Sequence, residues 1–230
     1  MDGNGCEASA FTPAHWWPAV DTLVQAFADD PVAKHLFPDA AQRRTGMAHV
    51  FGMQLRYGQL YGWVDVLKSA GAVAVWIRPE YTTPYWTRLV RVGLLASPFT
   101  VGWSATRRVL RFEHFIADCR MRTLAGPHWF LLCIGVRPDQ QGQGLGAALI
   151  RHGLQRIQST GVPCYLETAN ERNLVFYQKN GFRLVGQQHQ PSDGPGVWSL
   201  VAGGDQELAP GDGLKISCQR AEPVSGDARQ

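Results

Sequence analysis

The chain has 230 residues, of which 45% are hydrophobic and 18% charged, and its formal net charge is +3. These values predict a soluble globular protein of one large domain or one and a half, with a sizeable core, and the small net charge argues against nucleic acid as the main partner. The start of the chain lacks the pattern of a signal peptide, and its longest apolar stretch, near residues 92–103, is broken by Pro98. Because a membrane span needs roughly 20 apolar residues, we expect no membrane partner and a cytoplasmic location.

Five cysteines are scattered along the chain, at positions 6, 119, 133, 164 and 218. Their odd number and wide spacing argue against a disulfide framework and against a zinc site. We therefore expect no bound metal.

The first 60 residues predict two helices. Thr12 and Pro13 are typical of a helix start, and apolar residues then recur at helical spacing as far as Phe27. The run Asp29-Asp30-Pro31 is expected to end this first helix, although its two carboxylates are also candidates for binding a cationic substrate. A second helix is expected over about residues 39–60.

A hairpin and a further helical region follow. Apolar runs at 63–67 and 72–77 are joined by a short turn, which predicts an antiparallel pair of strands. Residues 84–124 are expected to be helical, with their aromatic side chains mostly in the core. This region holds seven arginines against two acidic residues, Glu113 and Asp118. They indicate either a solvated helix face or a positive wall beside an anionic ligand.

The second half of the chain alternates strands and helices before it ends in a hairpin. A continuous apolar run, Trp129 to Val136, is typical of a strand that is buried on both faces. The remaining elements are expected over residues 144–159 (helix), 163–168 (strand), 170–180 (helix), 182–190 (strand) and 196–201 (strand). Gly, Pro, Asp and Ser dominate residues 203–230, which predicts a disordered tail.

Between the strand at 129–136 and the following helix lies the sequence RPDQQGQGLGAAL. Glycines that open a helix allow backbone amides to approach a phosphate group closely. One interpretation is the dinucleotide fingerprint, read as Gly142-x-Gly144-x-x-Ala147 with Glu167 as the acidic residue on the next strand. The five residues between Val136 and Gly142 argue against it, because the first glycine of that fingerprint turns directly off the strand.

Read instead as Gln141-x-x-Gly144-x-Gly146 after Val136-x-Pro138, the segment resembles the acyl-CoA-binding loop of the GNAT family of N-acetyltransferases. The sequence LETANERNLVFYQKNGF, residues 166–182, is similar to the strand, loop and helix that follow this loop in the family. The resemblance extends over residues 12–202 and is nearest to the branch that includes puromycin N-acetyltransferase.

The resemblance implies the GNAT fold, of class α/β (α+β): a mixed, mostly antiparallel sheet of six to seven strands with flanking helices and a helical insertion. It implies one domain over residues 8–202, in which residues 84–126 form a helical elaboration on the acceptor side. One or two aromatic residues of this elaboration are candidates for lining an acceptor pocket. The oligomeric state stays open.

The resemblance also implies acetyl-CoA as co-substrate, held by a loop whose amides and helix dipole attract its pyrophosphate. Side chains at Gly144 and Gly146 would block this approach. The residues implied to bind acetyl-CoA are Ile134, Gly135, Val136, Gln141, Gly142, Gln143, Gly144, Leu145, Gly146, Asn170, Asn173 and Tyr177. For the two asparagines, capping of the next helix is an equally good interpretation.

The implied reaction is the direct attack of an amine on the thioester, in a ternary complex. By resemblance, Tyr177 is the acid that protonates the leaving thiolate, although it is also a candidate core aromatic. Many family members carry a carboxylate base on the strand before the loop, but the strand 129–136 has none. Glu167, His128 or a water chain are the alternatives for the base, and Glu167 is equally a candidate structural partner for an arginine.

The acceptor is then the amine of a small molecule or a peptide. The alternative function is a catalytically inactive CoA-binding sensor or interaction module, for which the missing strand carboxylate is the only support.

Overall fold

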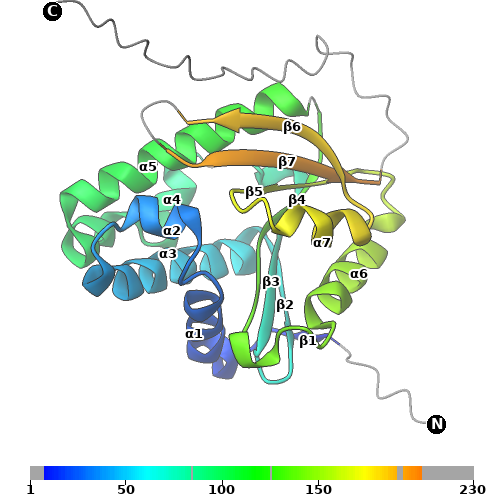
Figure 1. Cartoon of the computed structure of the whole chain (residues 1–230), viewed down its shortest axis with the longest axis horizontal. Helices are drawn as coiled ribbons and strands as arrows, with labels where there is room; N and C mark the ends of the chain where they lie inside the picture. Colours follow the sequence, from blue (N-terminus) through cyan, green and yellow to red (C-terminus); the bar gives the residue numbers. More distant parts are fainter. Residues whose placement is uncertain (1–7, 84, 125, 191–193, 204–230) are drawn as a thin grey trace, which may run out of the picture.

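The computed structural model describes residues 8–83, 85–124, 126–190 and 194–203. These residues form one seven-stranded sheet with helices packed on it (Figure 1). The strand order is β1-β2-β3-β4-β5-β7-β6. The strands are β1 (Ser9–Ala10), β2 (Gly62–Leu67), β3 (Ala72–Ile77), β4 (Trp129–Val136), β5 (Cys164–Thr168), β6 (Arg183–His189) and β7 (Gly196–Ala202).

Neighbouring strands are antiparallel except for β4 and β5, which are parallel. The mixed, mostly antiparallel sheet predicted from the sequence is therefore confirmed. The dinucleotide interpretation of the glycine segment is wrong at the level of the fold, because that fold requires a mostly parallel sheet.

The helices are bounded close to where the sequence predicts them. They are α1 (Trp16–Ala26), α2 (Pro31–Leu36), α3 (Ala40–Tyr61), α4 (Trp86–Val92), α5 (Ser97–Thr123), α6 (Leu145–Gln158) and α7 (Asn173–Lys179). The sequence did not predict the short helix α2. Asp30 not only follows the end of α1 but also caps α2, because its carboxylate accepts a hydrogen bond from the Val32 amide at 2.8 Å.

Strand β3 separates the two halves of the core, because successive side chains of a strand point to opposite faces of the sheet. Val73, Val75 and Ile77 pack with residues of α1, α3 and α5 on one face. Ala72, Ala74 and Trp76 pack with residues of α6 and α7 on the other. The whole of β3 is buried as a result.

The region between β3 and β4 is helical, as predicted, but its aromatic side chains are not mostly in the core. Tyr85, Trp86, Phe99 and Trp103 are 59–88% exposed. The helical pattern breaks at Gly102, where φ is 81° and ψ is 158°, so the first turn of α5 is offset from the rest of the helix. The periodic pattern identified the buried stripe after residue 104 correctly but gave no information about the part before the break.

The two parallel strands diverge along their length. Pairing between β4 and β5 is limited to Trp129 with Cys164 and Phe130 with Tyr165, although β4 continues to Val136. The register between β3 and β4 also shifts beyond this point, at a bulge that contains Leu132. The end of β4 therefore faces an opening on the side of β5, while its other side stays paired with β3.

Residues 204–230, for which the sequence predicts a disordered tail, lie outside the described residues, as do Cys6 and Cys218. The three cysteines that are described are buried and unpaired. None of the helices in the described ranges is long and apolar enough to cross a membrane.

Candidate active site

A large cleft of about 1180 Å³ opens where β4 and β5 diverge, and the glycine segment, the start of α6 and helix α7 complete its walls. It brings together most of the residues that the sequence predicted as coenzyme-binding. Those that line it are Ile134, Gly135, Val136, Gln141, Gly142, Gly144, Leu145, Gly146, Asn170, Asn173 and Tyr177.

The start of α6 presents free backbone amides to this cleft. Gly144 is the N-cap of α6 and has a φ of 77°, in the left-handed region that favours glycine, and no side chain caps this end of the helix. The first intrahelical bond is the one from the Ala148 amide to the Gly144 carbonyl. The amides of the first turn, together with the helix dipole, make this end of α6 a binding site for an anion such as a pyrophosphate.

Two other glycines of the cleft are closely packed against side chains. A Cβ at Gly146 would lie 3.1 Å from the ring of Phe176, and a Cβ at Gly135 would lie 2.9 Å from the side chain of Leu23. From the sequence, Gly146 was expected only to allow the close approach of the coenzyme. The structure adds a second reason, which is the close packing of α6 against α7.

Only one of the two glutamines that the sequence predicted as coenzyme-binding lines the cleft. Gln141 lines the cleft, and its amide nitrogen donates to the Val136 carbonyl at 3.0 Å, which holds the loop against the end of β4. Gln143 does not line the cleft. Its side-chain oxygen accepts a hydrogen bond of 2.6 Å from Lys68 in the turn between β2 and β3.

The two asparagines take part in local structure and also line the cleft. The Asn170 side chain accepts from the Arg172 amide at 3.2 Å, and the Asn173 amide nitrogen lies 3.5 Å from the Thr168 hydroxyl. Asn170 thus stabilises the turn that leads into α7, but neither asparagine side chain caps that helix, whose N-cap is Arg172. A position at the coenzyme site is compatible with the geometry of both.

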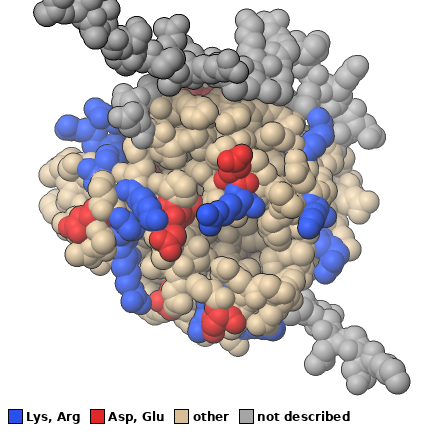
Figure 2. Space-filling model, viewed as in Figure 1, with Lys and Arg blue, Asp and Glu red and all other residues tan. Residues whose placement is uncertain are grey.

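Charged residues of both signs surround the cleft. Lys34, Arg172 and Lys179 line it together with Asp29 and Asp30. Figure 2 shows Lys and Arg interspersed with Asp and Glu on the face it presents, without one continuous basic patch. No residue of the 85–124 region lines the cleft, so its arginines do not form the positive wall considered from the sequence.

The cleft continues into an inner pocket, of about 140 Å³, that shares Ile134, Asn173 and Tyr177 with it. Tyr177 is 7% exposed, and burial raises the pKa of its hydroxyl well above the ordinary value of 10.0, assisted by Cys133 and Asp30. This hydroxyl therefore stays protonated at neutral pH. Tyr177 is both packed between aromatic neighbours and open to the pocket, so the two interpretations made from the sequence hold together.

Glu167 lines the same inner pocket. Its carboxylate lies 3.2 Å from the Arg120 guanidinium, with both side chains 7% exposed, and 2.8 Å from the Tyr165 hydroxyl. Burial raises the pKa of Glu167, while Arg120 and the hydrogen bond from Tyr165 oppose the shift. Glu167 is thus an arginine partner, as the sequence allowed, and also a carboxylate within the pocket that holds Tyr177.

His128, the other candidate base, is not a surface residue, because it is only 6% exposed. Its Nδ1 lies 3.0 Å from the Gly126 carbonyl, and burial lowers the pKa of its ring. It lines a separate pocket, beside Pro79 and Met121, and not the one that holds Tyr177 and Glu167.

A further carboxylate, Glu113 of α5, lines the inner pocket, and the sequence analysis did not single it out. The available signal was its spacing. Glu113 lies four residues after Val109 and three before Ile116, on the buried side of the helix. In the described ranges, no group of three or more His, Cys, Asp or Glu side chains is arranged to hold a metal ion.

Comparison with known proteins agrees with this geometry. Residues 103–184, which contain the glycine segment and α7, match the family model described as the acetyltransferase (GNAT) domain. An uncharacterized N-acetyltransferase of Schizosaccharomyces pombe is 26% identical over 170 residues, which are 71% of this chain and 69% of that protein. A mycothiol acetyltransferase of Propionibacterium freudenreichii is 35% identical over 78 residues, which span 27% of this chain and only 25% of that protein.

Among solved structures, an acetyltransferase of Corynebacterium glutamicum described as related to a histone acetyltransferase superposes with a TM-score of 0.62 and 24% identity. The match covers 86% of this chain and 96% of the other, and it supports the fold. The resemblance to the puromycin N-acetyltransferase branch stays a prediction.

Proposed function

We propose that this chain, which is an N-acetyltransferase carrying a GNAT acetyltransferase domain, moves an acetyl group from acetyl-CoA to the amine of a small molecule or peptide, by direct attack in a ternary complex. The observation that carries the proposal is the uncapped start of α6, whose free amides face the same cleft as Tyr177. An anion site and a buried acid are the two elements that transfer from a phosphorylated thioester requires.

In this proposal the pyrophosphate binds at the amides that follow Gly144, and the pantetheine arm lies along the end of β4. The opening beyond the short pairing of β4 with β5 leaves backbone groups near Ile134 available to the arm and to the thioester carbonyl, whereas the Val136 carbonyl already accepts a hydrogen bond from Gln141. Asn170 and Asn173 contribute from the opposite wall.

The amine nitrogen attacks the thioester carbon, a C–N bond forms and the C–S bond breaks. Tyr177 donates its proton to the departing thiolate, whose thiol has a pKa of about 8.5. The position of Tyr177 supports this role, because its hydroxyl is protonated at neutral pH and its side chain lines both the large cleft and the inner pocket. The proton that the amine loses passes to Glu167, directly or through water, and the buried position of Glu167 supports a carboxylate basic enough to accept it.

The test combines binding and turnover. Calorimetry with acetyl-CoA measures the first step, and release of free thiol with a panel of primary amines measures the second. We expect binding of acetyl-CoA and turnover of at least one amine. An absence of binding would contradict the proposal, and binding without turnover of any amine would favour the sensor or interaction module instead.

A further inference from the structure

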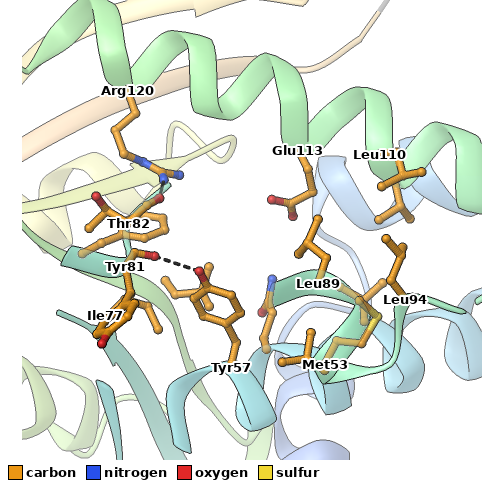
Figure 3. A pocket seen from close by; sticks show the side chains of 16 residues that line it. Met53, Tyr57, Ile77, Tyr81, Thr82, Leu89, Leu94, Leu110, Glu113 and Arg120 are labelled. Atoms are coloured by element: carbon orange, nitrogen blue, oxygen red, sulfur yellow. Dashed lines mark hydrogen bonds between the residues drawn. The ribbon is translucent and has the colours of Figure 1, made fainter. Parts of the chain in front are cut away.

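An apolar pocket lies between helices α3, α4 and α5 and the ends of β3 and β4 that carry Ile77 and Phe130, next to the inner pocket (Figure 3). Its walls are mostly aliphatic side chains from several elements. They include Met53, Ile77, Leu89, Leu94, Val109 and Leu110. Of the aromatic residues for which the sequence suggested a place in an acceptor pocket, Phe112 lines the inner pocket. The exposed side chains of Tyr85, Trp86, Phe99 and Trp103 line neither pocket.

One carboxylate enters this apolar pocket. Figure 3 shows the side chain of Glu113 pointing from α5 into the pocket. Burial raises the pKa of Glu113, and nearby Arg120 opposes the shift only in part. Within the residues that the structure describes, no ion pair or hydrogen bond of the Glu113 side chain is formed. A carboxylate in such a setting is costly unless a cation joins it.

The carboxylates of Asp30, Glu113 and Glu167 line the two joined pockets, and among the described residues only that of Glu113 has neither an ion pair nor a hydrogen bond. Arg120 is within ion-pair distance of Glu167, and it also donates to the Thr82 carbonyl. The Asp30 carboxylate accepts a hydrogen bond from the Val32 amide at the start of α2. Gln54, which faces both pockets, has a buried side-chain oxygen that lacks a hydrogen-bond partner among the described residues. Two acceptors, the Glu113 carboxylate and the Gln54 side-chain oxygen, thus face the two pockets without a hydrogen-bond partner among the described residues. The Nε of Arg120, which lines both pockets, is a buried donor that also lacks a partner there.

The apolar pocket is continuous with the site of reaction. It shares Gln54, Glu113 and Phe130 with the inner pocket, and the inner pocket shares Tyr177 with the large cleft. Glu113 therefore lies at the junction between an apolar chamber and the pocket that holds the proposed acid. A molecule that fills the chamber extends past Glu113 toward Tyr177.

We propose that the acceptor is a primary amine joined to an apolar body, with the body in the apolar pocket and the ammonium group bound by Glu113 and Gln54 at the junction. This inference rests on the proposed function and adds the class of acceptor to it. Glu113 attracts the protonated amine, which loses one proton through water before its nitrogen attacks the thioester. Glu113 then stabilises the positive charge that the nitrogen carries as it bonds to the acetyl carbon, until its second proton passes to Glu167. The aliphatic walls select against acceptors whose bodies are polar or carry a second charge.

The experiment compares hexylamine and 2-phenylethylamine with ethanolamine and agmatine as acceptors, with saturating acetyl-CoA. We expect kcat/KM to be at least about tenfold higher for hexylamine and 2-phenylethylamine than for ethanolamine and agmatine, because burial of each CH₂ group contributes favourably to binding. Hexanol and 2-phenylethanol then serve as inhibitors that have the same bodies without the charge.

The variant Glu113→Gln separates the contribution of the charge from that of the apolar walls. We expect it to raise KM for hexylamine about tenfold or more, as for loss of a hydrogen bond to a charged group, and to leave inhibition by hexanol within about twofold. Asp118→Asn, on the same helix but outside both pockets, is the matched control and should change neither value. Leu94→Ser should raise the KM for hexylamine and weaken inhibition by hexanol. Leu95→Ser, at a neighbouring residue that is 68% exposed, should change neither.

The outcomes distinguish this inference from the function on which it rests. Failure to bind acetyl-CoA contradicts the function itself. Suppose that acetyl-CoA binds and at least one amine is acetylated. If ethanolamine or agmatine then has a kcat/KM equal to that of the apolar amines, or if no apolar amine is acetylated, the inference is wrong and the function stands. If thermal unfolding shows that Glu113→Gln is poorly folded, two other measurements still test the inference. They are the comparison of the amines with the alcohols in the wild type, and the comparison of Leu94→Ser with Leu95→Ser.

Discussion

The guanidinium of Arg120 on α5 lies 3.2 Å from the carboxylate of Glu167 on β5, and both side chains are 7% exposed. This ion pair joins the helical region that follows β3 to the strand that borders the inner pocket. Arg120 also lies 3.9 Å above the ring of Phe130, so its charge is held by an aromatic face as well as by the carboxylate.

Replacing Arg120 by Met is expected to destabilise the fold by about 3–5 kcal/mol, because it leaves the Glu167 carboxylate buried without a counterion. Chemical denaturation measures this change in the free energy of unfolding. Arg122→Met is the control, since Arg122 is exposed on the same helix. An equal loss in both variants would mean that the ion pair contributes nothing specific.

Gly144 and Gly181 share a backbone conformation but differ in position. Their φ angles are 77° and 88°, but only Gly144 lines the large cleft. Alanine at either position should cost about 1–2 kcal/mol of stability, because non-glycine residues are strained at positive φ. Gly144→Ala alone should also weaken acetyl-CoA binding in calorimetry. Equal affinity in the two variants would argue that the start of α6 does not bind the coenzyme.

Asp65 on β2 supplies a prediction about pH. It is 3% exposed and accepts a hydrogen bond of 2.9 Å from Trp63. Burial raises its pKa above the ordinary value of 3.8, although the hydrogen bond from Trp63 and the nearby His152 oppose the shift. A carboxyl group whose pKa is raised by folding stabilises the fold below its unfolded pKa, and this contribution is lost as pH rises through the folded pKa.

Asp65→Asn should therefore raise the midpoint of thermal unfolding at pH 7 to 8, and the gain should shrink toward zero near pH 4. Asp21→Asn is the comparison, because Asp21 forms an exposed ion pair with Arg44 and should show little effect at any pH. A gain that does not depend on pH would show that the cause is not the charge of Asp65.

Local patterns in the sequence predicted the elements that build the large cleft. The continuous apolar run predicted β4, and the glycines before a periodic apolar stretch predicted the start of α6, because each depends on residues close together in the chain. The short helix α2 was missed, since Asp-Asp-Pro is typical both of a helix end and of a helix start.

Features that depend on long-range contacts were not predictable in the same way. The partner of Glu167 is 47 residues away in sequence, and nothing local to either residue identifies the pair. Glu113 became a candidate only when α3, α4 and α5 were seen to enclose an apolar pocket around it. Phe99 and Trp103, which are exposed, lie on either side of the break at Gly102, so the helical spacing of the later residues does not extend across it.

Tyr177→Phe tests the proposed acid with little disturbance of packing, because the ring keeps its contacts with Phe176 and Phe182. We expect kcat to fall by about 10²-fold or more, as for loss of a general acid, with KM for acetyl-CoA nearly unchanged. Tyr61→Phe is the control, since the buried Tyr61 hydroxyl has no partner in the described part of the chain and lies outside the cleft.

The identity of the leaving group distinguishes an acid from a residue that only shapes the pocket. The selenoester analogue of acetyl-CoA has a less basic leaving group, which needs less help from a proton donor. The rate ratio of wild type to Tyr177→Phe should therefore be much smaller with the selenoester than with the thioester. If the ratio is the same for both donors, Tyr177 does not protonate the leaving group, and its contribution is to packing alone.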